Sequence, residues 1–301
     1  MTHDFRQVDV FSDGPFTGNP VAVIASAADL TDEQMRAISR WTNLSECTFL
    51  LPPRASQADY RVRIFALETE LPFAGHPTLG TARAWLDLGG VPQRPGLVVQ
   101  ECGVGLVKVR VQADQLAFQA PPLMRSGPVS AQDRAALLRV LGLDEAHVVD
   151  AAWVDNGPGW AAVLVDSAET VLSVVPQPQA LDADHPQAIG VAGLYPHDVH
   201  DAPALEVRGF FPDGTGGLLE DPVTGSLNAS LAQWLISSGR LRPPYVARQG
   251  TVIGRRGRVL IEAGEDPAEA SGTEPSAESL WVGGRAEVRI RGSLTARAVD
   301  A

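Results

Sequence analysis

Short stretches in the first part of the chain alternate apolar and polar residues, and this pattern predicts β-strands. The stretches are 5–10, 21–24, 45–51, 60–67, 97–100, 105–111 and 115–119. A capping-box pattern at Thr31-Asp-Glu-Gln34, with apolar Met35, Ile38 and Trp41 behind it, predicts a helix over 32–42. A second helix, over 77–88, is expected between a proline at its start and two glycines after its end.

Two consecutive prolines, at 121–122, interrupt this pattern together with the Arg-Ser-Gly-Pro segment that follows, and they predict a hinge between two halves. The second half has the pattern of helices over 130–141 and 224–238, and of strands over 148–154, 160–165, 205–211, 250–261 and 280–291. Each half therefore has several strands and one helix rich in small residues. No sequence repeat of fixed period relates the halves.

The two small-residue helices, 77–88 and 224–238, are apolar on most of their circumference, so each is expected to be surrounded rather than laid on a surface. This favours an α+β fold of two similar domains, each a curved, mainly antiparallel sheet wrapped around a central helix. A doubly wound parallel sheet would need more alternating helices. The expected domains are 1–122, with a last strand near 288–301 returning to it, and 123–287, with the active-site cleft between them.

The composition agrees with about two folded domains. The chain has 301 residues, of which 45% are apolar and 20% charged, as in soluble globular proteins. Its net charge of -12, from 36 acidic and 24 basic residues, argues against nucleic acid and membranes as partners and favours a small molecule. Six acidic residues lie in the stretch 262–280, which has no lysine or arginine and predicts a solvated hairpin loop.

Several classes of site are not expected. No signal peptide or membrane span is indicated, and Cys47 and Cys102 have neither CxxC nor zinc spacing, so a cytoplasmic protein without disulfides is expected. The single lysine, Lys108, lies in a predicted strand, which argues against pyridoxal phosphate chemistry. No P-loop occurs, and Gly103-Val-Gly105 and Gly214-Thr-Gly-Gly217 do not complete a dinucleotide motif. No cofactor is therefore expected.

Two polar turns stand directly before the two small-residue helices, where N–H groups and a partial positive charge can hold an anion such as a carboxylate. The turns are Ala74-Gly-His-Pro-Thr78 and Asp221-Pro-Val-Thr-Gly-Ser226. Each turn carries or adjoins titratable groups, His76 in one case and Glu220-Asp221 in the other. Histidine suits proton transfer near neutral pH, but His76 and Asp221 can both be interpreted more simply as helix caps.

Glu46 is the third titratable candidate. Alternation along 45–51 places it on one face with Leu44, Thr48 and Leu50, a mostly apolar setting. Desolvation raises the pKa of a buried carboxyl group and makes it a usable acid and base near pH 7. The alternative is an exposed glutamate on an edge strand.

One further segment has residues that can ligate a metal. His197-Asp-Val-His200-Asp201 lies between prolines and has no helical period, so its histidines are expected to be solvated. No metal site is predicted.

A set of motifs occurs in order along the chain. They are Phe11-Ser-Asp-Gly-Pro-Phe-Thr-Gly-Asn-Pro-Val-Ala-Val23, Asn43-Leu-Ser-Glu46, Leu71-Pro-Phe-Ala-Gly-His-Pro-Thr78, Glu220-Asp-Pro-Val-Thr-Gly-Ser226, Gln249-Gly250 with Gly254-Arg255, and Val282-Gly-Gly284. Together they resemble the PhzF-like (phenazine biosynthesis) isomerase family, over residues 5 to beyond 290.

The resemblance implies the diaminopimelate epimerase-like fold, in which two similar domains enclose the site. Epimerases and racemases of that fold use two cysteine thiols, but the matching stretches here, 73–78 and 220–226, contain no cysteine. Members of the PhzF type use the glutamate of the Asn-Leu-Ser-Glu motif to move a proton. This role transfers to Glu46, helped by His76 and Asp221.

The resemblance also implies substrate contacts and an assembly. The implied substrate contacts are Asn19, Gly75, Gly225 and Ser226. A homodimer is common in the family and is expected here. The sequence departs from the family pattern at Cys47, where threonine is usual, and at Arg256-Gly257-Arg258, where Pro-Ser commonly follows Gly-Arg.

These observations lead to the hypothesis of a cofactor-independent isomerase acting on a small carboxylate-bearing metabolite. Glu46 would remove a proton from a carbon made acidic by the carboxylate and nearby unsaturation, and return it elsewhere on the same molecule. Two alternatives remain open. One is a racemase or epimerase using Glu46 and Asp221 in place of thiols, and the other is a non-catalytic small-molecule binding protein on the same scaffold.

Overall fold

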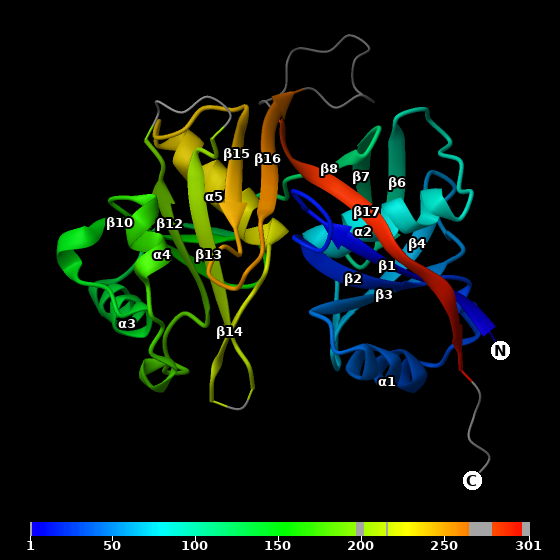
Figure 1. Ribbon diagram of the computed structural model, residues 1–301, viewed down its shortest axis with the longest axis horizontal. Coiled ribbons are helices and arrows are strands. Elements are labelled where there is room, and N and C mark those ends of the chain that lie inside the picture. Colours follow the sequence, from blue (N-terminus) through cyan, green and yellow to red (C-terminus); the bar gives the residue numbers. More distant parts are fainter. Residues whose placement is uncertain (1, 197–201, 215, 265–278, 297–301) are drawn as a thin grey trace. The chain divides into compact units, whose positions relative to one another are not determined.

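The computed structural model describes residues 2–196, 202–214, 216–264 and 279–296 (Figure 1). The chain forms two compact units, which are residues 1–119 with 283–301 and residues 120–282. Two segments interpreted from the sequence fall outside the described residues. They are the histidine-containing segment 197–201 and most of the acidic stretch 262–280.

The first unit is built mainly of strands. Its elements in chain order are β1 (Thr2–Val10), β2 (Asn19–Ile24), η1 (Ala27–Asp29), α1 (Asp32–Thr42), β3 (Glu46–Leu51), β4 (Tyr60–Ala66), β5 (Thr69–Leu71), α2 (Gly75–Asp87), β6 (Leu97–Cys102), β7 (Gly105–Gln112) and β8 (Gln115–Gln119). The strand β17 (Ser279–Thr295) returns to this unit from the end of the chain and pairs antiparallel with β1.

The strands of the first unit form a ring of hydrogen-bonded neighbours. β17 pairs with both β1 and β8, and the ring continues through β2, β3, β4, β6 and β7, with parallel pairs at β2–β3 and β4–β6. The helix α2 packs against β1, β2, β3, β6 and β8, and its residues 75–82 are all buried. The expectation of a small-residue helix surrounded by strands is confirmed here (Figure 1).

The helix α1 covers the other face of the first sheet. The predicted capping box is present, with Thr31 and Gln34 exchanging side-chain to backbone hydrogen bonds. Met35 and Ile38 pack into an apolar cluster with residues of β2, β3 and β4. Trp41 does not join this cluster and is 82% exposed, so its interpretation as part of the apolar face is wrong. It lies in the last turn of α1, beyond the covering strands.

The second unit is a mixed sheet with helices on both faces. Its elements are β9 (Arg125–Pro128), α3 (Ala131–Leu141), η2 (Glu145–His147), β10 (Val148–Asp155), β11 (Trp160–Val165), α4 (Ala168–Ser173), η3 (Pro178–Ala180), β12 (Ala188–Leu194), β13 (Leu205–Pro212), β14 (Leu218–Glu220), α5 (Gly225–Ser237), β15 (Tyr245–Gln249) and β16 (Gly257–Gly264). The sheet order is β9, β10, β11, β12, β13, β15, β16, and β14 also pairs with β13. The pairs β11–β12 and β13–β15 are parallel.

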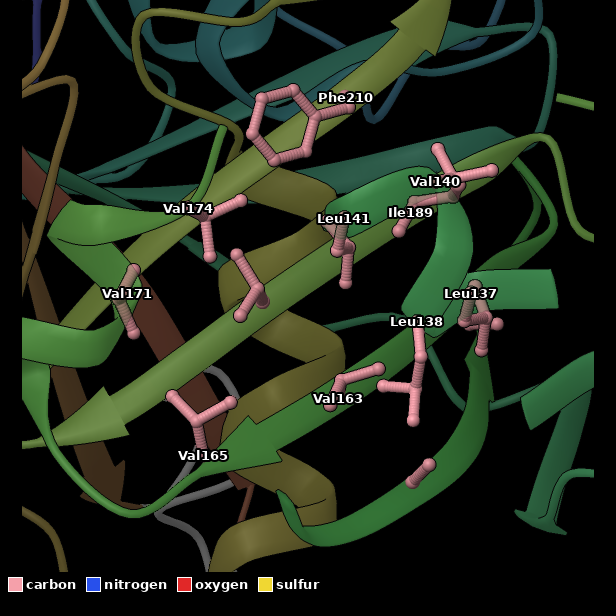
Figure 2. Close-up of a cluster of buried hydrophobic side chains, with 13 residues drawn as sticks. Leu137, Leu138, Val140, Leu141, Val163, Val165, Val171, Val174, Ile189 and Phe210 are labelled. Carbon is pink, nitrogen blue, oxygen red and sulfur yellow. The ribbon is translucent and has the colours of Figure 1, made fainter. Parts of the chain in front are cut away.

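Alternation along the strands gives this sheet two apolar faces. On one face, Gly190 of β12, which pairs with Ala162 of β11, lies against Leu227 of α5. On the other face, Val163 and Ile189 join α3 and α4 in an apolar cluster. Figure 2 shows this cluster in front of the strands, while α5 passes behind them. The second unit therefore has apolar packing on both faces of its sheet. The helix α5 is buried on one face, and α3 lies on the other.

Three sequence expectations for the second half are corrected. The single strand expected over 250–261 is a turn followed by β16, because Gly250 and Gly254 adopt positive φ values of 88° and 74°. The Arg-Ser-Gly-Pro segment expected to break the structure forms β9, which pairs with β10. The short helix α4 and the strands β12, β14 and β15 were not predicted. No helix among the described residues is both long and apolar enough to cross a membrane.

The close approach of α2 to β2 generates a prediction. A Cβ atom added at Gly80 would lie 2.2 Å from Val21 Cγ1 and 3.2 Å from Val10 Cγ2. Alanine gains about 1 kcal/mol of helix propensity over glycine, but overpacking a core costs about 1–3 kcal/mol. Because the 2.2 Å contact places the cost near the top of that range, we expect Gly80→Ala to lower the free energy of unfolding by about 2 kcal/mol, measured by urea denaturation. Gly292→Ala, at a position with open space around it, is the control. Equal stability of both variants would contradict the close packing of α2 against β2 at Gly80.

Candidate active site

Glu46 is the first residue of β3, a strand with neighbours on both sides. β2 runs parallel to it, with Val21 beside Glu46, and β4 pairs with it from Cys47 onward. The Glu46 side chain is 17% exposed, so the alternative of an exposed glutamate on an edge strand is wrong. Alternation places Glu46 on the face of Thr48, whose hydroxyl oxygen accepts a hydrogen bond from Thr81 of α2 at 2.8 Å. Glu46 therefore lies on the α2 side of the sheet.

His76 is the second residue of α2, and its side chain is only 4% exposed. The N-cap of α2 is Ala74, so the alternative of His76 as a helix cap is wrong. Its Nε2 atom lies 3.3 Å from Glu46 Oε2. Its Nδ1 atom forms a buried hydrogen bond with Asn19 Nδ2 at 3.4 Å. The fold thus brings together three predicted site residues from three separate elements of the first unit.

The imidazole of His76 is uncharged at neutral pH. Burial lowers its pKa to about 3, because desolvation disfavours the charged form. The contact with Glu46 is therefore between a carboxyl group and a neutral ring, and not between two opposite charges. A neutral imidazole has one N–H donor and one lone pair, so it can hold a neighbouring carboxyl group in a defined orientation.

Gly75 begins α2 and is buried. Ala74 at the N-cap provides no side-chain hydrogen bond to the first turn. The first N–H groups of a helix have no acceptor within the helix. The first N–H groups of α2 therefore receive no hydrogen bond from an N-cap side chain. This agrees with the expectation of a helix N-terminus that can hold an anion.

Asp221 follows β14 in the second unit and is 8% exposed. Its backbone N–H donates to the carbonyl oxygen of Gly209 at 3.0 Å, and its Oδ2 accepts a hydrogen bond from Thr224 Oγ1 at 2.6 Å. Thr224 is the N-cap of α5, and no side chain caps this helix. The alternative of Asp221 as a helix cap is therefore wrong.

The carboxamide of Gln249 holds the turn that contains Asp221. Its Oε1 accepts hydrogen bonds from the backbone N–H of Thr224 at 3.0 Å and from Asn228 Nδ2 at 2.9 Å. Its Nε2 donates to the carbonyl oxygen of Asp221 at 3.1 Å and to Thr224 Oγ1 at 2.9 Å. All four hydrogen-bonding positions of the amide are used. Sequence reasoning noted Gln249 only as part of a motif, since a glutamine before a glycine does not indicate which distant turn it contacts.

Gly225 and Ser226 are the first two residues of α5. Ser226 Oγ accepts a hydrogen bond from Trp160 Nε1 at 3.0 Å, and its carbonyl oxygen accepts one from Asn156 Nδ2 at 3.0 Å. Asn156 lies in the connection between β10 and β11, Trp160 is the first residue of β11, and neither contact was predicted. The only sequence signal there is a run of turn-forming residues, which indicates a loop and not a contact.

Cys47 and Cys102 are both free thiols, in agreement with the expectation of no disulfide. Burial raises the pKa of both thiols. Within the described residues, no group of three or more histidine, cysteine, aspartate or glutamate side chains is placed to hold a metal ion.

Comparisons with known proteins identify relatives along nearly the whole chain. A family model described as PhzC-PhzF, phenazine biosynthesis-like protein, matches residues 8–292. Antisense-enhancing sequence 1 of Schizosaccharomyces pombe is 31% identical, over 96% of this chain and 98% of its own. Trans-2,3-dihydro-3-hydroxyanthranilate isomerase of Pseudomonas fluorescens is 32% identical, over 93% of this chain and 98% of its own.

Solved structures agree with the family and the fold. A PhzF family protein of Enterococcus faecalis has a TM-score of 0.75 at 25% identity, over 98% of this chain and 100% of its own. A hydroxyproline epimerase of Agrobacterium vitis has the same fold, with a TM-score of 0.58 at 14% identity, over 97% of this chain and 92% of its own. The α+β, epimerase-like fold expected from the sequence is thus confirmed, and the chain belongs to the PhzF-like family of phenazine biosynthesis-like proteins and is an isomerase.

Proposed function

We propose that the protein is a cofactor-independent isomerase that moves a proton within a small carboxylate-bearing metabolite. The observation that carries this proposal is the 3.3 Å contact between Glu46 Oε2 and His76 Nε2. A largely buried carboxyl group, held beside a neutral imidazole, has the surroundings of a general acid/base catalyst. Both side chains belong to the first unit, where α2 and β3 fix their backbones.

In the proposed reaction, the Glu46 carboxylate accepts a proton from a substrate carbon. The electron pair of the broken C–H bond enters the conjugated system formed by the substrate's unsaturation and carboxylate. Glu46 then donates the proton to a second carbon of the same molecule, the double bond shifts, and the ionised carboxylate is regenerated. Atoms and electrons balance within the substrate, so the step requires neither an oxidant nor a reductant.

The names of relatives support a choice of first substrate. Relatives at 32–33% identity are named trans-2,3-dihydro-3-hydroxyanthranilate isomerases, and that compound is a small carboxylate-bearing molecule of the proposed class. We therefore propose it as the first compound to test. A broader panel of unsaturated carboxylates follows, with deuterium incorporation from solvent as a readout that does not require the product to be known.

We further propose roles for the predicted residues outside the Glu46–His76 pair. Asp221 acts as an additional acid/base group of the second unit. Gly75, and Gly225 with Ser226, contact substrate through backbone N–H groups at the uncapped starts of α2 and α5. Amides at helix N-termini stabilise negative charge, which suits a carboxylate or the charge that develops during proton transfer.

Glu46→Gln tests the central assignment. Glutamine keeps the size and polarity of the side chain but cannot carry the proton. We expect turnover and solvent deuterium incorporation to fall by at least about a hundredfold, with unchanged circular dichroism and thermal unfolding. Glu33→Gln, which removes the same charge from an exposed position on α1, is the control and keeps full activity. Near-normal exchange in Glu46→Gln would overturn the proposed function.

Asp221→Asn tests the second titratable group. The amide oxygen of asparagine can still accept the hydrogen bond that Thr224 Oγ1 donates at 2.6 Å, so the turn is retained while the acid/base capacity is lost. We expect kcat to fall by roughly a hundredfold, with little change in unfolding temperature. Asp150→Asn, which loses the ion pair with Arg240 at 2.8 Å, is the charge-matched control. Equal kcat in the two variants would remove Asp221 from the mechanism.

The buried neutral state of His76 predicts a pH dependence of stability. Its folded-state pKa of about 3 lies below the ordinary value of about 6.5, so the unfolded chain binds a proton first as pH falls. The stabilisation that the neutral His76 provides is therefore fully present above about pH 6.5. As the pH falls from there toward about 3, the free energy of unfolding decreases by up to about 1.4 kcal/mol per pH unit. We expect His76→Gln to flatten the dependence of the free energy of unfolding on pH in this range.

The control for this measurement is His147→Gln. His147 is exposed, and its hydrogen bond to Asp166 raises its pKa, so its effect on stability has the opposite sign. The steep decrease in the free energy of unfolding below about pH 6.5 should persist in His147→Gln. The same steep loss in His76→Gln would contradict a neutral buried imidazole.

A further inference from the structure

Asn19 contacts His76 from the start of β2. Its side chain is fully buried, and its Nδ2 atom lies 3.4 Å from His76 Nδ1 in a buried hydrogen bond. The other ring nitrogen, Nε2, lies 3.3 Å from Glu46 Oε2. The imidazole is therefore held between a carboxamide on one side and a carboxyl group on the other.

The direction of the hydrogen bond from Asn19 decides where the imidazole carries its proton. An amide nitrogen donates and does not accept, so His76 Nδ1 must contribute its lone pair. The low pKa of about 3 leaves the ring neutral at neutral pH, with a single N–H. That proton is then on Nε2, the nitrogen that faces Glu46.

The turn before Asn19 fixes the point from which its carboxamide extends. The buried carboxylate of Asp9 accepts hydrogen bonds from the backbone N–H groups of Thr17 at 3.2 Å and Gly18 at 2.9 Å. A Cβ atom at Gly18 would lie 2.1 Å from the carbonyl oxygen of Val10, so the chain is drawn against β1 at this place. The β1–β2 register then sets Asn19 directly opposite Val10.

We infer that Asn19 is a positioning residue that holds His76 in its Nε2–H tautomer, so that a donor and not a lone pair faces Glu46. This role differs from the substrate contact implied by the resemblance. The effect of this positioning role on catalysis rests on the proposed function, in which Glu46 carries the proton. An N–H donor stabilises the carboxylate form of Glu46, the form that accepts a proton from the substrate. In the opposite tautomer, two lone pairs would face each other and displace the carboxyl group.

Asn19→Asp tests this inference by showing which nitrogen of His76 carries the proton, in addition to its effect on activity. An ionised aspartate accepts but does not donate, so it draws a proton onto His76 Nδ1. The full-length protein, labelled with ¹⁵N-histidine, is examined by two-bond ¹H–¹⁵N correlation at neutral pH, with His76 assigned by the loss of its signals in His76→Gln. We expect the Nε2–H tautomer in the wild type and a protonated Nδ1 in Asn19→Asp.

Asn43→Asp is the matched control. It adds the same charge to the same unit, at an exposed position after α1 with a φ of 51° that aspartate tolerates, and it should leave the His76 signals unchanged. We also expect Asn19→Asp to lower kcat roughly ten- to hundredfold while KM stays within about threefold. Asn19→Leu removes the donor without adding charge, so the Nε2–H tautomer should no longer be fixed, and we expect a mixture of both tautomers with a smaller fall in kcat than in Asn19→Asp.

The outcomes separate this inference from the proposed function. A wild-type spectrum with the proton on His76 Nδ1 overturns the inference, as does a folded Asn19→Asp variant with wild-type signals. If Asn19→Asp does not fold, the wild-type spectrum decides alone. Normal turnover in Glu46→Gln would overturn the proposed function instead, and it would leave the tautomer measurement unaffected.

Discussion

The burial of α2 is the constraint on which the first unit depends. Small and apolar residues cover nearly its whole circumference, so the helix requires strands on every side, and Gly80 lets β2 approach closely enough to provide them. A side chain in the first turn of such a helix loses its contact with water. This is why His76 is neutral and why its polar partners come from strands, with Asn19 on β2 and Glu46 on β3. The proposed catalytic residues thus lie on regular elements of the first unit, which suits a site that requires a defined geometry.

The sequence predicted those elements whose signals are local. The capping box of Thr31 and Gln34 and the small-residue composition of α2 and α5 are properties of adjacent residues, and these helices were predicted within two residues of their ends. The segment 125–128 has the composition of a turn and becomes a strand only because β10 offers it a partner. Conversely, the segment 250–261 was expected to form one strand, while the positive φ of Gly250 turns the chain. Pairing across the sheet decided the first case and the backbone conformation of Gly250 the second, and no local pattern of apolar and polar residues encodes either.

Residue chemistry was enough to nominate the candidate site residues but not to predict their contacts. Glu46, His76 and Asp221 are titratable groups in motifs, whereas the contact between Asn19 and His76 spans 57 positions. Gln249 reaches Thr224 across 25 positions, and its role depends on the β13–β15 pairing, which aligns it beside Val207. A buried carboxamide with all its hydrogen bonds satisfied costs little and specifies one geometry, but the sequence shows only that a glutamine is present.

The position of Cys47 explains why the proton carrier that we propose at this strand is a carboxyl group and not a thiol. Successive residues of a strand point to opposite faces, so Glu46 lies on the side of α2 while Cys47 packs into the apolar cluster with Met35 of α1 and Phe49. Burial there raises the pKa of the Cys47 thiol, and a thiol without an accessible thiolate is neither a base nor a nucleophile. The proton transfer that we propose on the α2 side of β3 therefore rests on Glu46, while the thiol beside it in the sequence packs into the apolar cluster.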